Sequence, residues 1–167
     1  MKPPTIVDNF LPKEVFDELQ KELVWNKLVK WALLYEVTHE QENSLEDFCL
    51  VNMIFNQGKC FNAPLWMFFE KHLFKLLDAK AFLRIKVNFY PHTHELTTHS
   101  FHQDYAFDHK GMIFSLNTCN GGTVMQETGE KFSSKANRAV FFNPKDYHAS
   151  TTTTDQKGRF NIIFNYL

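Results

Sequence analysis

The sequence has few cysteines, almost no net charge and no long hydrophobic segment. Its three cysteines, Cys49, Cys60 and Cys119, are an odd number and show neither metal-binding nor redox spacing. We therefore expect reduced thiols in a reducing compartment. The formal net charge of -1 gives no basic field for a polyanion, so nucleic acid is not an expected partner.

Targeting segments are missing as well. The opening residues, Met1 to Asp8, contain no long apolar stretch, so we expect no secretory signal peptide. No uninterrupted apolar run approaches the roughly 20 residues that cross a bilayer as a helix, and no membrane partner is expected. These absences predict a cytoplasmic protein. No feature of the sequence indicates an oligomeric state.

The sequence does contain abundant material for a hydrophobic core. Of its 167 residues, 44% are apolar and eighteen are phenylalanine. A chain of this length is sufficient for one domain and short for two. We predict a single domain over residues 1–167, with a helical N-terminal part at about 1–80 and a strand-rich part at about 81–167.

Helical periodicity appears twice in the N-terminal half. Pro12 suits the first turn of a helix, and apolar residues recur every four positions behind it. Pro64 opens a second helix with one wide apolar stripe. The polar stretch from Thr38 to Asp47 is predicted to be a solvated loop or an exposed helix face. The apolar positions are Leu11, Val15, Leu19 and Leu23 in the first helix, and Leu65, Phe68, Phe69, Leu73, Leu76 and Leu77 in the second.

After residue 81 the period changes to two, which is typical of a half-buried strand, and Pro91 ends the pattern. Apolar Leu83, Ile85, Val87 and Phe89 alternate with polar Arg84, Lys86, Asn88 and Tyr90. Further short strands are predicted at 100–107, 111–117, 122–126, 138–143, 147–152 and 159–166, with a tight turn at Asn120-Gly121-Gly122. Helices followed by many short strands predict an α+β fold, a jelly roll with N-terminal helices packed on one sheet.

Histidines and a carboxylate occur in a pattern suited to iron. Non-haem Fe(II) sites use two neutral imidazoles and one carboxylate on one face and leave the other positions open. Residues two apart on a strand point the same way, so His102 and Asp104 would present two ligands side by side. His148, the only histidine after His109, is the candidate third ligand. His-x-Asp spacing is common by chance, and without a metal His102 would be a surface strand residue and His148 a loop residue.

A fourth element strengthens the metal interpretation. Arg159 lies eleven residues after His148, at the start of the last predicted strand, and Asn161 follows on the same face. A dicarboxylate co-substrate that chelates iron leaves its far carboxylate in need of a cation. A planar guanidinium can bind that carboxylate through a pair of hydrogen bonds.

The other histidines are interpreted as structural. His72 lies within the apolar stripe of the second helix and is predicted to be a packed or edge residue. His92, His94 and His99 are predicted to be surface or rim residues near the entrance of the site. On a strand, His99 would face away from His102, because the two are three residues apart.

The chain resembles the Fe(II)/2-oxoglutarate oxygenases, and most closely their prolyl-4-hydroxylase-like branch, over roughly residues 82–166. The matching elements occur in the order His102-x-Asp104, Asn120-Gly-Gly-Thr123, His148 and Arg159. The resemblance implies a double-stranded β-helix core in which His102, Asp104 and His148 bind Fe(II). It also implies that Arg159 binds the far carboxylate of the co-substrate 2-oxoglutarate, with ascorbate as an accessory reductant.

Two further residue pairs extend the resemblance to the residues that bind the co-substrate in the family. Asn88-x-Tyr90 resembles the pair with which some members hydrogen-bond 2-oxoglutarate, and Arg159-x-Asn161 resembles the Arg-x-Asn of the nucleic-acid demethylases. Those demethylases carry a second arginine six residues on, where this chain has Asn165, and this departure counts against nucleic-acid repair. Prolyl hydroxylases of the collagen type use lysine in the arginine role, so Arg159 departs from that subgroup as well.

The expected activity is that of a dioxygenase that hydroxylates a peptidyl proline, a free amino acid or another small molecule. Related halogenases replace the carboxylate ligand by glycine or alanine, so Asp104 favours hydroxylation. Two alternatives stay open. One is a cupin-type metal protein that does not use 2-oxoglutarate and has no need for Arg159, and the other is a non-enzymatic jelly-roll binding module.

Overall fold

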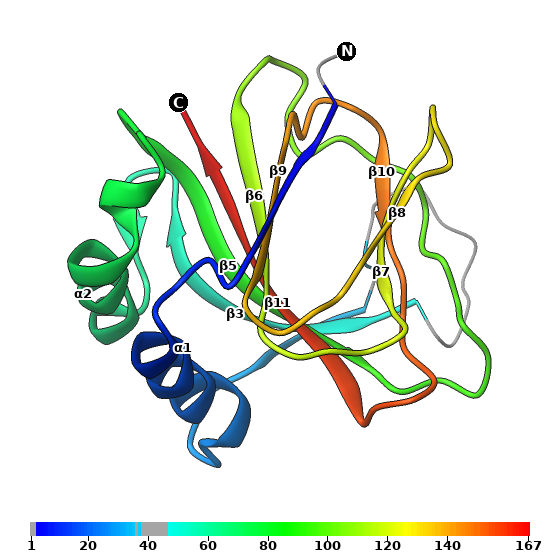
Figure 1. Ribbon diagram of the computed structural model, residues 1–167, viewed down its shortest axis with the longest axis horizontal. Helices are drawn as coiled ribbons and strands as arrows, with labels where there is room; N and C mark the ends of the chain where they lie inside the picture. The colour runs from blue at the N-terminus through cyan, green and yellow to red at the C-terminus, as the bar shows by residue number, and fades with distance from the viewer. Residues whose placement is uncertain (1–2, 36, 38–46) are drawn as a thin grey trace.

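The computed structural model describes residues 3–35, 37 and 47–167. They form two β-sheets, with the helices lying against the outer face of the larger one (Figure 1). The helical elements are α1 (Lys13–Gln20), a π-helical turn η1 (Lys21–Trp25), α2 (Ala63–His72) and a 3-10 turn η2 (Phe74–Leu76). The strands are β1 (Thr5–Asp8), β2 (Ala32–Leu34), β3 (Cys49–Asn56), β4 (Lys59–Cys60), β5 (Phe82–Pro91), β6 (Lys110–Ser115), β7 (Gly122–Met125), β8 (Lys131–Ser133), β9 (Arg138–Phe142), β10 (His148–Ser150) and β11 (Gly158–Tyr166).

The two sheets are antiparallel and face each other. The larger sheet has the strand order β1-β9-β6-β11-β5-β3-β2, with β4 paired to β3, and the smaller sheet has the order β10-β7-β8. Ile113 and Ile163 of the larger sheet form a buried cluster with Met125 and Phe132 of the smaller one. This arrangement confirms the predicted α+β jelly roll with N-terminal helices on one sheet.

The outer face of the larger sheet is apolar because the helices cover it. Ile85 and Phe164 lie in one buried cluster with Leu19 of α1 and Phe69 of α2. The rings of Phe69 and Phe164 meet edge to face, with 5.3 Å between their centroids. Since strand side chains alternate between faces, the polar residues of β5 and β11 are turned to the opposite, inner face.

The N-terminal part is less helical than predicted. Strands β1, β2 and β3 belong to the larger sheet, and β3 pairs directly with β5. A register shift between Met53 and Phe55 interrupts the alternation of β3, so the sequence pattern does not display a strand there. Of the polar stretch at Thr38 to Asp47, residues 38–46 lie outside the described residues. Asp47 is buried, contrary to the expectation of a solvated segment.

The structure differs from the sequence predictions at three further places. The predicted strand at 100–107 is reduced to one isolated bridge between His102 and His148. The neighbouring residues form hydrogen bonds to another loop instead of extending the strand, and the Gln103 side chain donates to Lys145 O at 2.6 Å. The second helix ends at His72 and continues as the short turn η2. The short strand β8 was not predicted.

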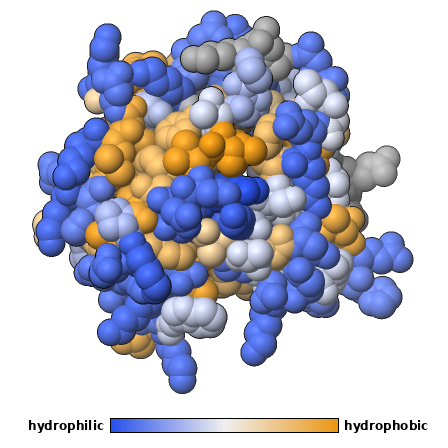
Figure 2. Space-filling view, in the orientation of Figure 1, coloured by the Kyte–Doolittle hydropathy of each residue, from blue (hydrophilic) through white to orange (hydrophobic). Residues whose placement is uncertain are grey.

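The surface over β1 combines apolar and charged side chains. Ile6 and Val7 are exposed on this edge strand, and Figure 2 shows a hydrophobic patch beside a strongly hydrophilic group in this region. Asp8 forms ion pairs with Lys135 and Arg138, and such charges at an edge discourage strand addition. Within the described residues, no helix combines the length and the apolar character needed to cross a membrane.

Asn137 connects the N-terminal segment to the turn before β9. Its backbone has a positive φ of 61°, and its side chain is buried. The side-chain amide accepts from Leu11 N at 2.9 Å and donates to Leu11 O at 2.8 Å. Its own carbonyl accepts from Phe10 N at 3.0 Å.

Replacing Asn137 by alanine should therefore lower the free energy of unfolding by about 2–4 kcal/mol. The change leaves two backbone groups of Leu11 without partners and places a Cβ without a compensating polar group in the left-handed region. Asn137→Gly should cost less, because glycine accepts the positive φ. Urea denaturation of both variants measures the difference. A loss below about 0.5 kcal/mol for Asn137→Ala would show that this connection is not important for stability.

Candidate metal centre

Three side chains converge between the two sheets. The ligand atoms of His102, Asp104 and His148 all lie within 4.8 Å of one another, and within the described ranges this is the only such group of His, Cys, Asp and Glu. The backbones of His102 and His148 exchange hydrogen bonds of 2.9 and 3.0 Å, and Asp104 N donates to Pro144 O at 2.9 Å. Backbone pairing thus brings the two predicted ligand segments together.

The two imidazoles are oriented for metal binding. Nδ1 of His148 lies 2.8 Å from Asp146 O, and Nδ1 of His102 lies 3.3 Å from Ser100 O. A carbonyl oxygen only accepts, so each Nδ1 carries the proton and each Nε2 keeps a lone pair. Burial and the neighbouring His148 lower the pKa of His102 to about 4. His102 is therefore a neutral ligand at pH 7.

Both oxygens of the Asp104 carboxylate are hydrogen-bonded. Arg84 Nη2 donates to Oδ1 at 2.5 Å and Asn165 Nδ2 donates to Oδ2 at 2.8 Å. Burial alone would raise the pKa of Asp104, but the Arg84 charge, the neighbouring His148 and Lys86 and the hydrogen bond from Asn165 together outweigh burial and hold the pKa well below its usual range. A carboxylate has about four acceptor positions, so each oxygen can still bind a metal.

The polar inner row extends away from these ligands along β5 and β11. The register pairs Asn165 with Arg84 at one end and Arg159 with Tyr90 at the other. Between them Asn161 pairs with Asn88, and Asn88 Nδ2 donates to Asn161 Oδ1 at 3.0 Å. The four predicted co-substrate residues, Arg159, Tyr90, Asn88 and Asn161, therefore lie together on one face.

Arg159 is a buried cation, with 1% of its surface exposed. Its Nη1 donates to Thr151 O at 3.2 Å and its Nη2 donates to Thr123 Oγ1 at 3.0 Å. The guanidinium lies over the Tyr90 ring at 5.2 Å. In the described part of the chain no carboxylate pairs with it, and Nε has no hydrogen-bond partner. A buried guanidinium in this state is prepared for an anion.

The predicted turn at Asn120-Gly121-Gly122 contributes to this pocket. A Cβ on Gly121 would lie 2.3 Å from Thr152 O and 3.1 Å from Arg159 Cδ. Only glycine allows the turn to approach so closely. The turn thereby delivers Thr123, the residue whose hydroxyl accepts from Arg159.

Tyr90 and Asn88 differ in what they offer a ligand. Burial raises the pKa of Tyr90 to about 12, so the phenol stays protonated and can donate a hydrogen bond. Asn88 Oδ1 is buried without a partner in the described structure. Both are deeply buried, and the prediction that they share the polar face of their strand agrees with the register.

Of the four histidines interpreted as structural, three have the predicted exposure and one does not. His92 and His94 are exposed, and His72 is half-buried with its ring 4.9 Å from that of Phe68. His99 is not a rim residue, because it is buried with Nδ1 3.2 Å from Asp47 Oδ1. The irregular chain between His99 and His102 invalidates the strand argument that placed it outside.

Sequence reasoning missed three polar residues near the metal ligands: Arg84, Lys86 and Asn165. The same alternation that placed Asn88 and Tyr90 on the inner face also places Arg84 and Lys86 there. Asn165 was noticed only as a departure from a family pattern. The missing information was the distance of each residue from Asp104, which depends on the loop at 100–104.

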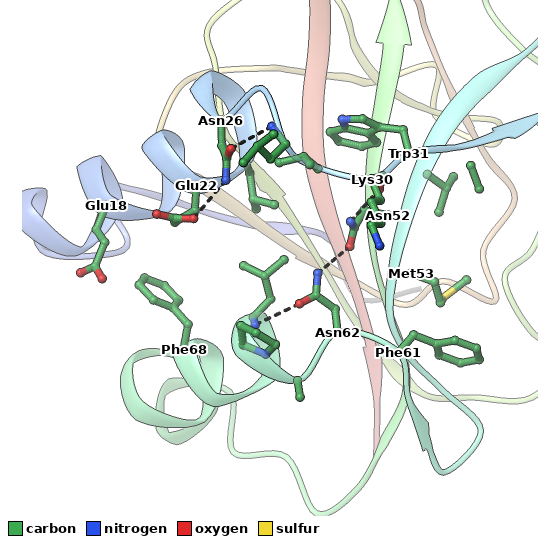
Figure 3. A pocket seen from close by; sticks show the side chains of 18 residues that line it. Glu18, Glu22, Asn26, Lys30, Trp31, Asn52, Met53, Phe61, Asn62 and Phe68 are labelled. Atoms are coloured by element: carbon green, nitrogen blue, oxygen red, sulfur yellow. Dashed lines mark hydrogen bonds between the residues drawn. The ribbon is translucent and has the colours of Figure 1, made fainter.

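The molecule also has pockets away from this centre. One of about 800 Å³ lies between α1, α2 and β3 (Figure 3). In it Asn62 Nδ2 donates to Asn52 Oδ1 at 3.1 Å, and Asn52 Nδ2 donates to Lys30 O at 2.9 Å. The Asn52 and Asn62 amides of this pocket are thus bonded within the protein, and the pocket shares no residue with the His-Asp-His cluster.

No protein-family model matches the chain, and no curated protein matches it in sequence. Solved structures do match it. A prolyl hydroxylase from Trichoplax adhaerens, in complex with a hypoxia inducible factor oxygen degradation domain peptide fragment, gives a TM-score of 0.69 at 13% identity, covering 98% of this chain and 83% of that chain. A prolyl-4-hydroxylase from Pseudomonas putida gives 0.62 at 14% identity, covering 98% and 91%.

A third neighbour is HygX from Streptomyces hygroscopicus with nickel and 2-oxoglutarate bound. It gives a TM-score of 0.64 at 7% identity, covering 98% of this chain and 82% of that chain. At such low identity these likenesses concern the fold. The chain has the fold of the Fe(II)/2-oxoglutarate oxygenases, prolyl hydroxylases among them, which confirms at the level of the fold the resemblance predicted from the sequence.

Proposed function

We propose that the protein is an Fe(II)- and 2-oxoglutarate-dependent oxygenase that hydroxylates a peptidyl proline or a small molecule. The observation that supports this most is the buried guanidinium of Arg159, which lacks a carboxylate partner among the described residues. It lies on the same inner face as Asn165, which bonds the metal-ligand candidate Asp104. A cupin-type metal protein without this co-substrate would leave that cation unexplained.

The cluster fits a divalent iron. The ligand atoms of His102, Asp104 and His148 lie within 4.8 Å of one another, and two imidazoles with one carboxylate are the ligand set typical of non-haem Fe(II). Each histidine is fixed by a backbone acceptor at Nδ1 and Asp104 by Arg84 and Asn165, the outer partners that orient such ligands. Bound iron would supply oxidative chemistry coupled to the decarboxylation of 2-oxoglutarate to succinate.

The protein's own part is to orient the co-substrate. Arg159 would bind the far carboxylate through its free edge, with Tyr90 donating a hydrogen bond from its protonated phenol. Asn88 and Asn161 lie one step closer to the metal ligands along the paired strands. Because all four are buried, they would exclude water from the co-substrate. The use of ascorbate and the cytoplasmic location remain expectations from the sequence.

The ligand assignment predicts the effect of removing each ligand. His102→Ala, Asp104→Ala and His148→Ala should each abolish tight Fe(II) binding, because an open site with three protein ligands cannot spare one. His94→Ala, which removes an exposed histidine, is the matched control and should bind iron normally. Anaerobic calorimetry with Fe(II) gives the stoichiometry. Full iron affinity in all three alanine variants would move the metal site elsewhere.

Arg84 should stabilise the ligand-free protein through the Asp104 charge. The pKa of Asp104 is lowered on folding, so its contribution to stability is present above the unfolded pKa of about 3.9 and is lost as the pH falls. Arg84→Met should reduce the free energy of unfolding at pH 7 by about 2–4 kcal/mol, because it leaves a buried charge unpaired.

A double variant separates this effect from lost packing. Arg84→Met combined with Asp104→Asn should be more stable at pH 7 than Arg84→Met alone, since the second change removes the unpaired charge. Chemical denaturation of the metal-free proteins measures both. If Arg84→Met is equally destabilised with and without Asp104→Asn, the ion pair is not the cause.

Arg159 separates 2-oxoglutarate use from other metal chemistry. Arg159→Met should weaken 2-oxoglutarate binding by roughly thirty- to several-thousand-fold, because truncating one partner of a buried charge pair costs ~2–5 kcal/mol. Arg159→Lys should have an intermediate affinity for 2-oxoglutarate, since lysine keeps the charge but cannot form the paired hydrogen bonds of a guanidinium. Fe(II) affinity should barely change in either variant.

The measurement is a titration of 2-oxoglutarate into the anaerobic Fe(II) protein, followed by its visible charge-transfer band. Arg138→Met removes an arginine that pairs with Asp8 at the sheet edge and serves as the matched control. Unchanged 2-oxoglutarate affinity in Arg159→Met would remove the arginine from the site and with it the main support for this co-substrate.

A further inference from the structure

Lys86 occupies an unusual place on the inner face of β5. It lies between Arg84 and Asn88 in the polar row, and its cross-strand neighbours are apolar: Ile163 on β11 and Met53 on β3. Its side chain is half-buried. Burial and the nearby Arg84 charge lower the pKa of Lys86, whereas Asp104 raises it.

The ammonium of Lys86 has no partner in the part of the chain that the structure describes. Asp104 is the nearby carboxylate, and its two oxygens are bonded to Arg84 and Asn165. A methionine or leucine would suit the apolar cross-strand neighbours better than a lysine does. A half-buried lysine beside apolar neighbours and next to a candidate site is therefore a candidate for a functional role.

A co-substrate whose far carboxylate is held by Arg159 would not extend to this position. Its far carboxylate belongs to the layer of Arg159 and Tyr90, which is four residues from Lys86 along β5. A five-carbon dicarboxylate spans about two residues of strand, roughly 7 Å, and so extends to the layer of Asn88. Lys86 lies in the next layer, on the side of the metal ligands.

The charges around the metal ligands also leave room for another anion. Arg84, Lys86 and a divalent iron are positive, whereas Asp104 and the near carboxylate of 2-oxoglutarate are negative. Positive charge would therefore be in excess with the metal and the co-substrate bound. In a partly dry interior such an excess favours a further anionic ligand.

We propose that Lys86 binds a carboxylate of the prime substrate, so that the enzyme acts on a carboxylate-bearing compound and discriminates against its neutral amide. This inference rests on the proposed function. It assigns Lys86 as a specificity residue, because it contacts the substrate away from the bond that reacts. A free amino or organic acid and an acidic side chain of a peptide would supply the same group.

The test uses the anaerobic Fe(II) and 2-oxoglutarate complex and a panel of matched pairs. The probes are free L-amino acids and small organic acids, each with its carboxamide, and blocked peptides that contain aspartate or glutamate with their asparagine or glutamine counterparts. Binding is read from the change in the visible charge-transfer band and from the thermal midpoint. The wild type should bind at least one acid about tenfold or more tightly than its amide.

Four variants complete the experiment. Lys86→Met should lose the preference for the acid while its 2-oxoglutarate affinity stays within about threefold of wild type, and Lys86→Arg should keep the preference. Without any ligand, Lys86→Met should raise the thermal midpoint by about 2–6 °C, since an unpaired interior charge is removed. Lys86→Glu should repel the acids. Lys71→Met, on the exposed side of α2, is the matched control and should match wild type.

The outcomes distinguish the two proposals. Failure of wild type to bind 2-oxoglutarate would overturn the proposed function itself. If 2-oxoglutarate binds but no acid in the panel is preferred over its amide, or the preference survives in Lys86→Met, the role of Lys86 is refuted. A loss of 2-oxoglutarate affinity in Lys86→Met as large as that in Arg159→Met would assign Lys86 to the co-substrate and would also refute it.

Discussion

The register between β5 and β11 is the constraint on which the site depends. It pairs Arg159 with Tyr90, Asn161 with Asn88 and Asn165 with Arg84, so these three polar side chains of β11 each meet a polar side chain of β5. The register is fixed from outside, because the intervening apolar residues pack against α1 and α2. A slip by one residue would turn both polar rows toward the helices and the apolar rows toward the metal ligands. Helix packing on one face therefore maintains the chemistry on the other.

The inner face holds several charges that the protein alone does not neutralise. Asp104 is matched by Arg84, whereas Arg159 is buried without a carboxylate among the described residues. Each unmatched interior charge reduces the stability of the ligand-free fold. The extensive apolar packing around the helices supplies stability to offset this cost. This distribution agrees with the proposed site, in which ligands would complete the charges. The ligand-free protein should then be easier to stabilise by substitution at these positions.

Sequence reasoning was most successful where periodicity and spacing carry local information. The alternation of β5 and the stripe of α2 predicted the two faces of the larger sheet, and His102, Asp104 and His148 converge as a three-ligand site requires. It failed where tertiary contacts determine whether a segment forms a strand or a side chain is buried. The bulge in β3 hides a strand that has no clean alternation, and His99 is buried against Asp47, a residue far away in the sequence. The role of Arg84 depends on a loop that brings Asp104 to it, and no local pattern encodes that loop.

The difference between constraints set by the backbone and those set by particular side chains explains how the fold persists at 7–14% identity to its structural neighbours. The two candidate histidine ligands are positioned by backbone hydrogen bonds between His102 and His148 and by carbonyl acceptors at their Nδ1 atoms. Backbone groups are present in every sequence, so these constraints leave the surrounding side chains free to change. The outer face requires only apolar alternation, which many residue combinations satisfy. Under the proposed function, what must remain specific is a short set of side chains on the inner face, too few to produce overall sequence similarity.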